Sequence, residues 1–389
     1  MRVCPSGPRL LSSNVLEFLT DCATFGHLVQ KLTPTKSGPV RLKDVARYLG
    51  ISISTASAAL QNREDISELT RERVRRAAGE LGYEPDSVAR SLVTRRSNVL
   101  GVVVPDLSRS FFSELLKGVD SVASDEGYNL LVCNTEEDAA KEDRIIGMLK
   151  SRRVDGLLIA SAHNARTRHW KEAYRNLVVP AVFVDRRLPG FHFVGGDDET
   201  IGLRATIHLA EQGYRRIAHI SGPRTVATAI GRRKGYLQAL SKLGLARVPE
   251  MVVEASYHEE SGGYEAMRKL LQLTAPPDAV FAASDPIAIG AMQAALDTGL
   301  EIPGQLGLIG VGAHQYSKYL RVPLSTIEQQ RNRIGQEATR MVLEFIRGTE
   351  PARPRQILVE PRLIIRESSS PRRAVTVESL AEGPSAPVG

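Results

Sequence analysis

The sequence has few cysteines and no long apolar run. Its 389 residues include three cysteines, Cys4, Cys22 and Cys133, without metal-ligand spacing. So sparse a set excludes a disulfide framework and fits a reducing cytosol. No apolar run approaches the roughly 20 residues of a membrane helix, and acidic residues such as Glu17 interrupt the apolar positions of residues 1–32. We therefore expect a cytoplasmic protein without a signal peptide or a membrane span.

Recognisable catalytic motifs are also missing. The sequence contains no GxSxG elbow and no HExxH pair, and GVGAHQ, at Gly310–Gln315, lacks the third glycine of a dinucleotide fingerprint. The eight histidines are scattered. We therefore expect no enzyme, no cofactor and no metal site. An α/β enzyme without a recognisable motif stays open as an alternative.

The sequence also has no strong excess of positive or negative charge. The formal net charge is +7, spread along the chain, and residues 40–97 carry eleven Lys and Arg against eight Asp and Glu. Charge alone therefore does not establish binding to nucleic acid.

What is present begins with Arg41–Leu60, RLKDVARYLGISISTASAAL. Apolar residues at i, i+3, i+4 and i+7 predict a first helix, which Gly50 ends: Leu42, Val45, Ala46 and Leu49. Ser52 is a suitable N-cap for a second helix. Its buried face would consist of Ala56, Ala59 and Leu60, and the opposite face is small and uncharged.

A third periodic segment ends at Gly82 and predicts another helix, through Val74, Ala77, Ala78 and Leu81. Three short helices with a tight turn between the first two are typical of a helix-turn-helix, whose second helix enters the DNA major groove. The pattern alone fits any small helical bundle equally well.

The run KDVARYLGISISTASAAL, continued by TRERVRRAAGELGYEPDSVARSL, resembles the lactose-repressor/galactose-repressor (LacI/GalR) family of bacterial transcription regulators. The resemblance extends to about Glu367. It implies base-reading roles for Ile53, Ser54 and Ala58, and phosphate or backbone contacts for Thr55, Ser57 and Gln61. Family members most often carry arginine where this chain has Ala58. Because arginine paired to guanine supplies about 1–3 kcal/mol of discrimination, we predict an unusual operator.

Residues 85–97 follow, with a short capped segment but no second apolar stripe to hold it. The resemblance implies a hinge helix that becomes ordered only on DNA. Leu92 matches the leucine that the family inserts between base pairs, and Arg90 is a candidate phosphate contact. The alternative is an ordinary linker.

From Val99 apolar runs alternate with helix-length segments, and the pattern restarts near Thr200. This predicts two α/β lobes with parallel sheets, and the last strands suggest that the chain crosses between lobes more than once. The resemblance implies an α/β two-lobed domain of the periplasmic-binding-protein-like (type I) class, with a ligand cleft between the lobes. We expect a domain at 40–84, a hinge at 85–97, an effector and dimerisation domain at 98–367, and a disordered tail at 368–389.

Residues 1–39 precede the region of resemblance. Two interpretations are open: these residues are a functional N-terminal arm, or the start site is placed too early and translation begins near Val40. Family members usually begin just before the first helix of the DNA-binding domain. We favour the second interpretation.

Ligands of open parallel sheets bind beyond the carboxyl ends of the strands. Residues at or after those ends are Phe111, Phe112, Asp185, Arg232, Tyr257 and Asp285. Carboxylates, a forked arginine and aromatic faces suit a neutral, hydroxyl-rich ligand. Asp285 could also be only a helix cap, and the aromatic residues only core.

The resemblance places Arg232 and Asp285 at effector contacts, but Ile230 and GVGAHQ depart from the pattern of sugar-binding members. The resulting hypothesis is a homodimeric repressor of a palindromic operator in double-stranded DNA, controlled by a carbohydrate effector in the interlobe cleft. A free-standing sugar-binding protein is the other alternative.

Overall fold

The computed structural model describes residues 40–84, 96–164, 169–174, 177–257 and 259–370. The chain forms two compact units, Met1–Ser87 and Val88–Gly389. The predicted N-terminal extension, the hinge positions Arg90 and Leu92, and residues 371–389 lie outside the described residues.

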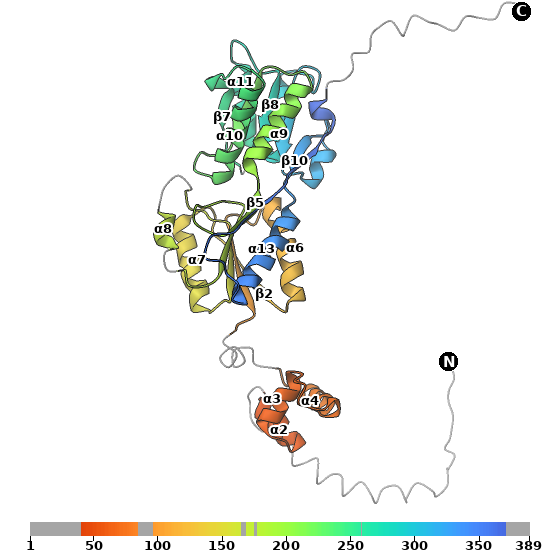
Figure 1. Ribbon diagram of the computed structural model, residues 1–389. Coiled ribbons are helices and arrows are strands. Elements are labelled where there is room, and N and C mark those ends of the chain that lie inside the picture. The colour runs from red at the N-terminus through yellow and green to blue at the C-terminus, as the bar shows by residue number, and fades with distance from the viewer. Residues whose placement is uncertain (1–39, 85–95, 165–168, 175–176, 258, 371–389) are drawn as a thin grey trace, which may run out of the picture. The chain divides into compact units, whose positions relative to one another are not determined.

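Residues 40–84, the described part of the first unit, form three helices, α2 (Leu42–Leu49), α3 (Ile53–Leu60) and α4 (Glu68–Leu81) (Figure 1). Gly50 and Gly82 end α2 and α4 in the left-handed conformation, with φ of 67° and 66°. These helices and their ends confirm the prediction from apolar periodicity. The side chains of the small core come from all three helices: Val45, Ala46, Ala56, Ala59, Val74, Ala77 and Ala78.

In its described residues, the second unit contains two six-stranded sheets. The first is parallel throughout, in the order β11 (Gln356–Val359), β5 (Phe193–Gly196), β4 (Ala181–Val184), β3 (Gly156–Ile159), β1 (Val99–Val104) and β2 (Asn129–Asn134). The second has the order β12 (Arg362–Ile364), β10 (Ser325–Glu328), β9 (Gly307–Val311), β8 (Ala279–Ala282), β6 (Ile217–Ser221) and β7 (Val252–Glu254). Only β12 is antiparallel. Two lobes with parallel sheets were predicted, and this prediction is confirmed.

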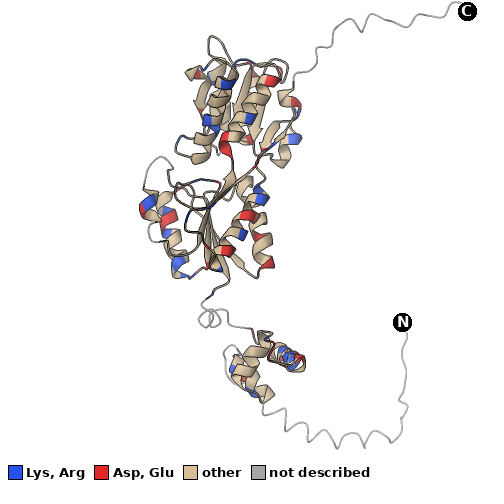
Figure 2. Ribbon diagram, viewed as in Figure 1, with Lys and Arg blue, Asp and Glu red and all other residues tan. Residues whose placement is uncertain are grey.

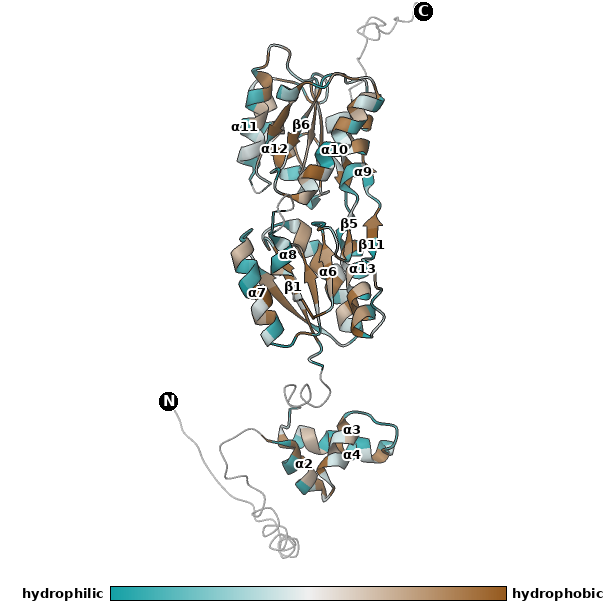
Figure 3. Ribbon diagram, turned by 60° about the vertical axis from the view of Figure 1, so that its left-hand side comes forward, coloured by the Kyte–Doolittle hydropathy of each residue, from teal (hydrophilic) through white to brown (hydrophobic). Residues whose placement is uncertain are grey.

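Helices cover both faces of each sheet, so the strands are apolar on both sides (Figure 3). Those on the first sheet are α6 (Ser110–Asp125), α7 (Ala139–Ser151), α8 (Trp170–Ala173) and α13 (Arg331–Ile346). Those on the second sheet are α9 (Asp198–Glu211), α10 (Ala227–Lys242), α11 (Glu260–Leu271) and α12 (Asp285–Asp297). Short 3-10 turns lie at Pro249–Met251, Gln315–Lys318 and Glu367–Ser369. No helix among these described residues is both long and apolar enough to pass through a bilayer.

The chain passes between the lobes after β5, after β10 and after β11. Each crossing joins a strand of one lobe to the next element of the other, as was predicted from the last strands. The crossings lie beside the carboxyl ends of strands in both sheets, which is where a parallel sheet places its ligands.

Helices α9 and α10 pack with their backbones in contact. A Cβ atom added at Gly202 would lie 2.0 Å from the carbonyl oxygen of Arg232, and one at Gly235 would lie 1.9 Å from that of Glu199. Only glycine permits this approach. The contact fixes the segment of α10 that carries Arg232.

The C-terminal segment differs from the prediction. Ser368 and Ser369 are fully buried. The Ser368 hydroxyl donates to the Leu308 carbonyl at 2.6 Å, and the Ser369 hydroxyl lies 2.7 Å from the hydroxyl of Ser325. A disordered tail that begins at residue 368 is therefore wrong for residues 368–370, because these serines satisfy buried polar groups of the second lobe.

Candidate functional site

Helix α3 is held so that one face points away from the core of the first unit. The Ser52 hydroxyl caps the helix by accepting from the Thr55 backbone N–H at 3.0 Å. Ala56 and Ala59 are fully buried, whereas Ile53 is 54% exposed. An isoleucine so exposed at the start of a helix is available for an apolar contact with a partner.

The outward face of α3 carries no charge, and much of its polar capacity is already used (Figure 2). The Ser54 hydroxyl lies 2.7 Å from that of Ser52, and the Gln61 amide donates to the Ser57 hydroxyl at 3.1 Å. Ala58 is half-buried. Basic residues of this unit lie instead on α4, which carries four arginines, and on α2, which carries Lys43 and Arg47 (Figure 2).

The second unit contains a cavity of about 270 Å³ at the strand ends. Its lining comes from both lobes and from the crossing after β10: Ser108, Arg109, Ser110, Phe111, Phe112, Asp185, Arg186, Val226, Thr228, Arg232, Tyr257, Glu260, Ser284, Pro286, Val311, Gly312, His314, Tyr316, Gln329 and Arg331. Aromatic rings combined with a few convergent polar groups are typical of a small-molecule site.

The structure brings five of the six predicted effector residues to this cavity: Phe111, Phe112, Asp185, Arg232 and Tyr257. Phe111 and Phe112 form an edge-to-face pair with ring centroids 5.1 Å apart. Phe112 is only 1% exposed and packs in the core of the first lobe. Its contribution is therefore mainly to the shape of the wall.

Asp285 is the exception. It is fully buried and does not line the cavity. Its carboxylate accepts from the Thr326 hydroxyl at 2.6 Å, the Ser317 hydroxyl at 2.9 Å and the His314 backbone N–H at 2.9 Å. The cap of α12 is Ser284, which accepts from Ile287 N–H. The structure thus places Asp285 as an anchor for the loop that carries His314. It corrects the interpretation of Asp285 as the helix cap, and the predicted effector contact of Asp285 stays a prediction.

Asp185 directly follows β4 and has a left-handed backbone, with φ of 60°. Its side chain is 13% exposed, and among the described residues no donor forms a hydrogen bond with its carboxylate. Burial raises the pKa of Asp185, although Arg186 and Arg232 oppose this effect. A carboxylate with free lone pairs beside a cavity can accept a pair of ligand hydroxyl groups.

Arg232 lies on the floor of the cavity and is 5% exposed. Its Nε donates to Asp198 at 2.9 Å and its Nη1 donates to the Ala283 carbonyl at 2.6 Å. The Tyr257 ring lies over the guanidinium, at 6.0 Å from the ring centroid. Burial raises the pKa of Asp198 to about 7 despite the charge of Arg232.

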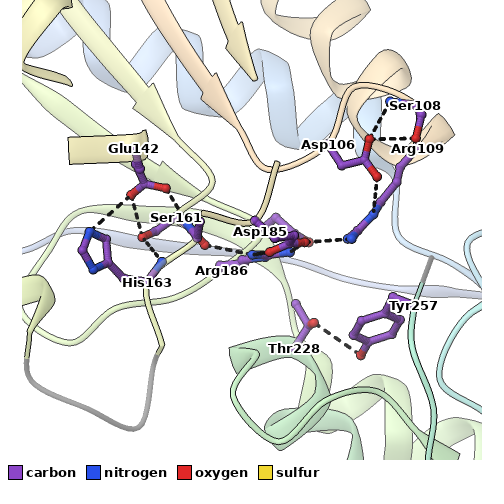
Figure 4. A network of polar contacts seen from close by, with 12 residues as sticks. Asp106, Ser108, Arg109, Glu142, Ser161, His163, Asp185, Arg186, Thr228 and Tyr257 are labelled. Atoms are coloured by element: carbon purple, nitrogen blue, oxygen red, sulfur yellow. Dashed lines mark hydrogen bonds and ion pairs between the residues drawn. The ribbon is translucent and has the colours of Figure 1, made fainter. Parts of the chain in front are cut away.

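Reasoning from the sequence missed an ion-pair network on the first-lobe side of the cavity (Figure 4). Arg186 donates from both terminal nitrogens to Glu137, at 2.6 Å each, and Nη1 also donates to the Ser161 carbonyl at 3.0 Å. Arg109 donates to the same carboxylate at 2.7 Å. Burial raises the pKa of Glu137, but these two arginines outweigh it and hold the pKa at about 2.

Besides Arg109, four cavity-lining side chains have a buried polar atom without a hydrogen-bond partner among the described residues: Ser110 Oγ, Arg186 Nε, His314 Nδ1 and Arg331 Nη1. Two of these atoms lie near a carboxylate, because Asp185 is 3.9 Å from Arg186 Nε and Asp285 is 3.4 Å from His314 Nδ1. Such groups are costly unless a ligand or water satisfies them. Arg186 follows Asp185 at a predicted strand end and could have been found from the sequence. Arg331 could not, because its lack of an ion pair depends on contacts with distant parts of the chain.

Comparison with known protein families gives two matches. Residues 41–86 match the family described as "Bacterial regulatory proteins, lacI family". Residues 97–367 match "Periplasmic binding proteins and sugar binding domain of LacI family".

Similar proteins cover nearly the whole described chain. The ribose operon repressor of Halalkalibacterium halodurans is 33% identical over 329 residues, which span 84% of this chain and 96% of that protein. The transcriptional repressor CytR of Escherichia coli K12 is 34% identical over 333 residues, with 84% and 96% covered. Among solved structures, the lac repressor dimer bound to operator and the anti-inducer ONPF has a TM-score of 0.78 at 26% identity, covering 86% of this chain and all of that chain. A complex of the regulator CelR with cellobiose has a TM-score of 0.65 at 28% identity, covering 85% and 99%.

Proposed function

The chain belongs to the LacI family of bacterial transcription regulators, and we propose that it is a repressor that binds a palindromic operator as a homodimer and is controlled by a carbohydrate effector in the cavity. The observation that carries this proposal is the occurrence, in one chain, of a helix-turn-helix with an outward α3 and a two-lobed unit with a polar cavity. A two-fold symmetric dimer presents two such helices to two half-sites.

The two alternative functions, a free-standing sugar-binding protein and an α/β enzyme, are less well supported. A free-standing binding protein would have no use for α3, with its 54% exposed Ile53. The similar proteins are repressors and not enzymes. We therefore propose a non-enzymatic protein that works in the cytoplasm, where its DNA is.

In this proposal α3 reads the operator mainly through apolar contacts. Ile53 and Ala58 can meet thymine methyl groups, whereas Ser54 bonds several base edges weakly. Thr55, Ser57 and Gln61 contact the backbone of the DNA. Arg90 would contact phosphate and Leu92 would insert between base pairs. The specificity for the operator would then depend more on how easily its central base pairs are deformed.

The cavity in this proposal binds a carbohydrate. Asp185 accepts ligand hydroxyl groups, Arg232 donates to ligand oxygens, and the rings of Phe111 and Tyr257 cover the apolar face of a sugar. Effector binding changes the arrangement of the lobes and hence the ability of residues 85–97 to fold on DNA. Phe112 shapes the wall, and Asp285 holds the His314 loop in place.

The experiment is a selection of operator sequences from random duplexes with the purified full chain, followed by affinity measurements. We expect a palindrome with thymine at the positions that Ile53 meets. Ile53→Ser should weaken the selected site by about 1–3 kcal/mol. Leu69→Ser is the matched control, because Leu69 is 70% exposed but lies on α4. Failure to enrich any palindrome would overturn the proposal.

The ligand side needs its own measurement. Sugars that raise the melting temperature should be tested for their effect on affinity for the selected operator. We expect a change in affinity for each true effector. A sugar that binds in the cavity and leaves the operator affinity unchanged would contradict the proposed mechanism.

A further inference from the structure

Arg331 differs from the other arginines of the cavity. It is the first residue of α13, just after the crossing from β10. Arg109, Arg186 and Arg232 each lie within 2.9 Å of a carboxylate oxygen, whereas within the described part of the chain Arg331 has no ion pair. Its Nη2 donates weakly to the Ala313 carbonyl at 3.4 Å, and its Nη1 is buried without a partner.

Two of the three carboxylates whose charges act on Arg331 already have other partners. Glu114 forms an ion pair with Lys117 at 2.7 Å, and Asp285 accepts from three donors of its own loop and strand. Burial therefore lowers the pKa of Arg331, although the charge of Glu114 opposes the shift. A guanidinium that loses water without gaining a counter-charge destabilises the protein that carries it.

Other features of the same cavity also favour negative charge. Helices α13 and α10 begin at Arg331 and Ala227, beside the cavity, and the N-caps Gln330 and Val226 provide no side-chain cap. Unsatisfied N–H groups make the first turn of a helix positive. Arg186, which is 5% exposed, adds a buried Nε without a hydrogen-bond partner. Although Asp185 and Glu260 also line the cavity, its arginines therefore present donor atoms, Arg186 Nε and Arg331 Nη1, that no hydrogen bond among the described residues satisfies.

We infer that the effector carries an acidic group, a carboxylate or a phosphate, which pairs with Arg331 while Asp185 accepts hydroxyl groups from the rest of the molecule. The effector class is then a sugar acid or a sugar phosphate, and the neutral ligand expected from the sequence is replaced by an anionic one. This inference rests on the proposed function of the cavity as the effector site, and it refines the chemistry of that site.

Matched pairs of probes test the inference by titration calorimetry on the full-length protein. The pairs are D-glucose with D-glucuronate and D-ribose with D-ribose 5-phosphate, and inorganic phosphate alone is included. We expect the acidic member of at least one pair to bind about tenfold more tightly or better than its neutral partner, because charge-assisted hydrogen bonds to arginine are the stronger kind. The pair that shows the gain distinguishes carboxylate from phosphate.

Arg331→Gln should remove that gain, so that the acidic and the neutral member of the pair bind with similar affinity, and Arg331→Lys should keep part of it. Arg333→Gln is the matched control, because Arg333 lies two residues further along α13, is exposed and does not line the cavity. Equal binding of both members in the wild type, or an unchanged gain in Arg331→Gln, would overturn the inference. Binding of phosphate alone as tight as that of the sugar phosphate would also overturn it, because the site would then recognise only a simple anion.

If no probe binds, the melting temperature of the free protein tests whether Arg331 lacks a counter-charge. Arg331 is half-buried, its Nη1 is buried, and it has no ion pair among the described residues. Removing this charge should stabilise the protein, so we expect Arg331→Gln to raise the melting temperature by about 2–4 °C and Arg333→Gln to leave it unchanged. An unchanged or lower melting temperature of Arg331→Gln would show that the charge is satisfied by the protein and overturn the inference.

The inference and the proposed function fail separately. A neutral sugar that binds more tightly than its acidic partner and alters operator affinity refutes only the acidic group of the effector. An acid that binds through Arg331 without altering operator affinity refutes only the regulatory function.

Discussion

Replacing Asp285 by alanine should destabilise the second unit by about 3–5 kcal/mol. The substitution removes an acceptor that is fully buried and leaves two hydroxyls and the His314 backbone N–H without their partner. An unsatisfied buried group costs about 1–3 kcal/mol. We expect a total cost below the upper limit for three such donors, because the loop that carries His314 can move so that water reaches some of them.

Urea unfolding followed by circular dichroism measures the effect on Asp285→Ala and Asp285→Asn. The amide keeps one acceptor oxygen, so Asp285→Asn should lose less stability. Asp297→Ala is the matched control at the other end of α12, because Asp297 is exposed and accepts from Gln293 and Tyr264 at the surface. We expect the control to change the free energy of unfolding by less than about 1 kcal/mol.

The effect should also depend on pH in one direction. Burial raises the pKa of Asp285, but the hydrogen bonds from His314 and Thr326 outweigh it, so the folded pKa lies below its ordinary value. A depressed folded pKa stabilises the protein above the unfolded value of about 3.9, and this stabilisation is lost as the pH falls through the folded pKa. The difference between wild type and Asp285→Ala should therefore shrink in acid. A loss below about 1 kcal/mol at pH 7, together with loss of effector binding, would refute the structural role and favour direct contact with the ligand.

Three further changes test the packing and the ion-pair network. Gly202→Ala should destabilise by about 1–3 kcal/mol in urea unfolding, because its Cβ would lie 2.0 Å from the Arg232 carbonyl oxygen. Gly79→Ala in α4, where the added Cβ has no atom within 4 Å, should instead be neutral or stabilise by about 0.5–1 kcal/mol. Glu137→Gln should cost about 3–5 kcal/mol by leaving Arg186 buried without its ion pair, and a loss under about 1 kcal/mol would count against the network. The contribution of Glu137, whose folded pKa is about 2, should be complete above its unfolded pKa of about 4.3 and disappear as the pH falls toward 2.

Elements defined by neighbouring residues could be predicted from the sequence. The ends of α2 and α4 follow from Gly50 and Gly82, and the strands of both sheets follow from continuous apolar runs. Strand β5 was missed because it has four residues, two of them glycine, Gly195 and Gly196. Such a segment has little apolar signal, and it forms a strand because β4 and β11 supply partners on both sides.

The candidate site was harder, since its chemistry depends on contacts between distant parts of the chain. Asp285 stands at the start of α12, but the hydroxyl donors that decide its role come from Ser317 and Thr326, 32 and 41 residues further on. Arg331 looks in the sequence like any arginine at the start of a helix. Only the folded structure shows that the neighbouring carboxylates are occupied, because ion pairs of buried residues are set by tertiary packing.

The central claim is that the cavity and the DNA-binding helices are coupled, and reciprocal titration tests it most directly. The affinity for operator is measured with and without saturating effector, and the affinity for effector with and without saturating operator. Coupling requires both ratios to be the same factor, typically about 5–150-fold. Two ratios of one would contradict the account.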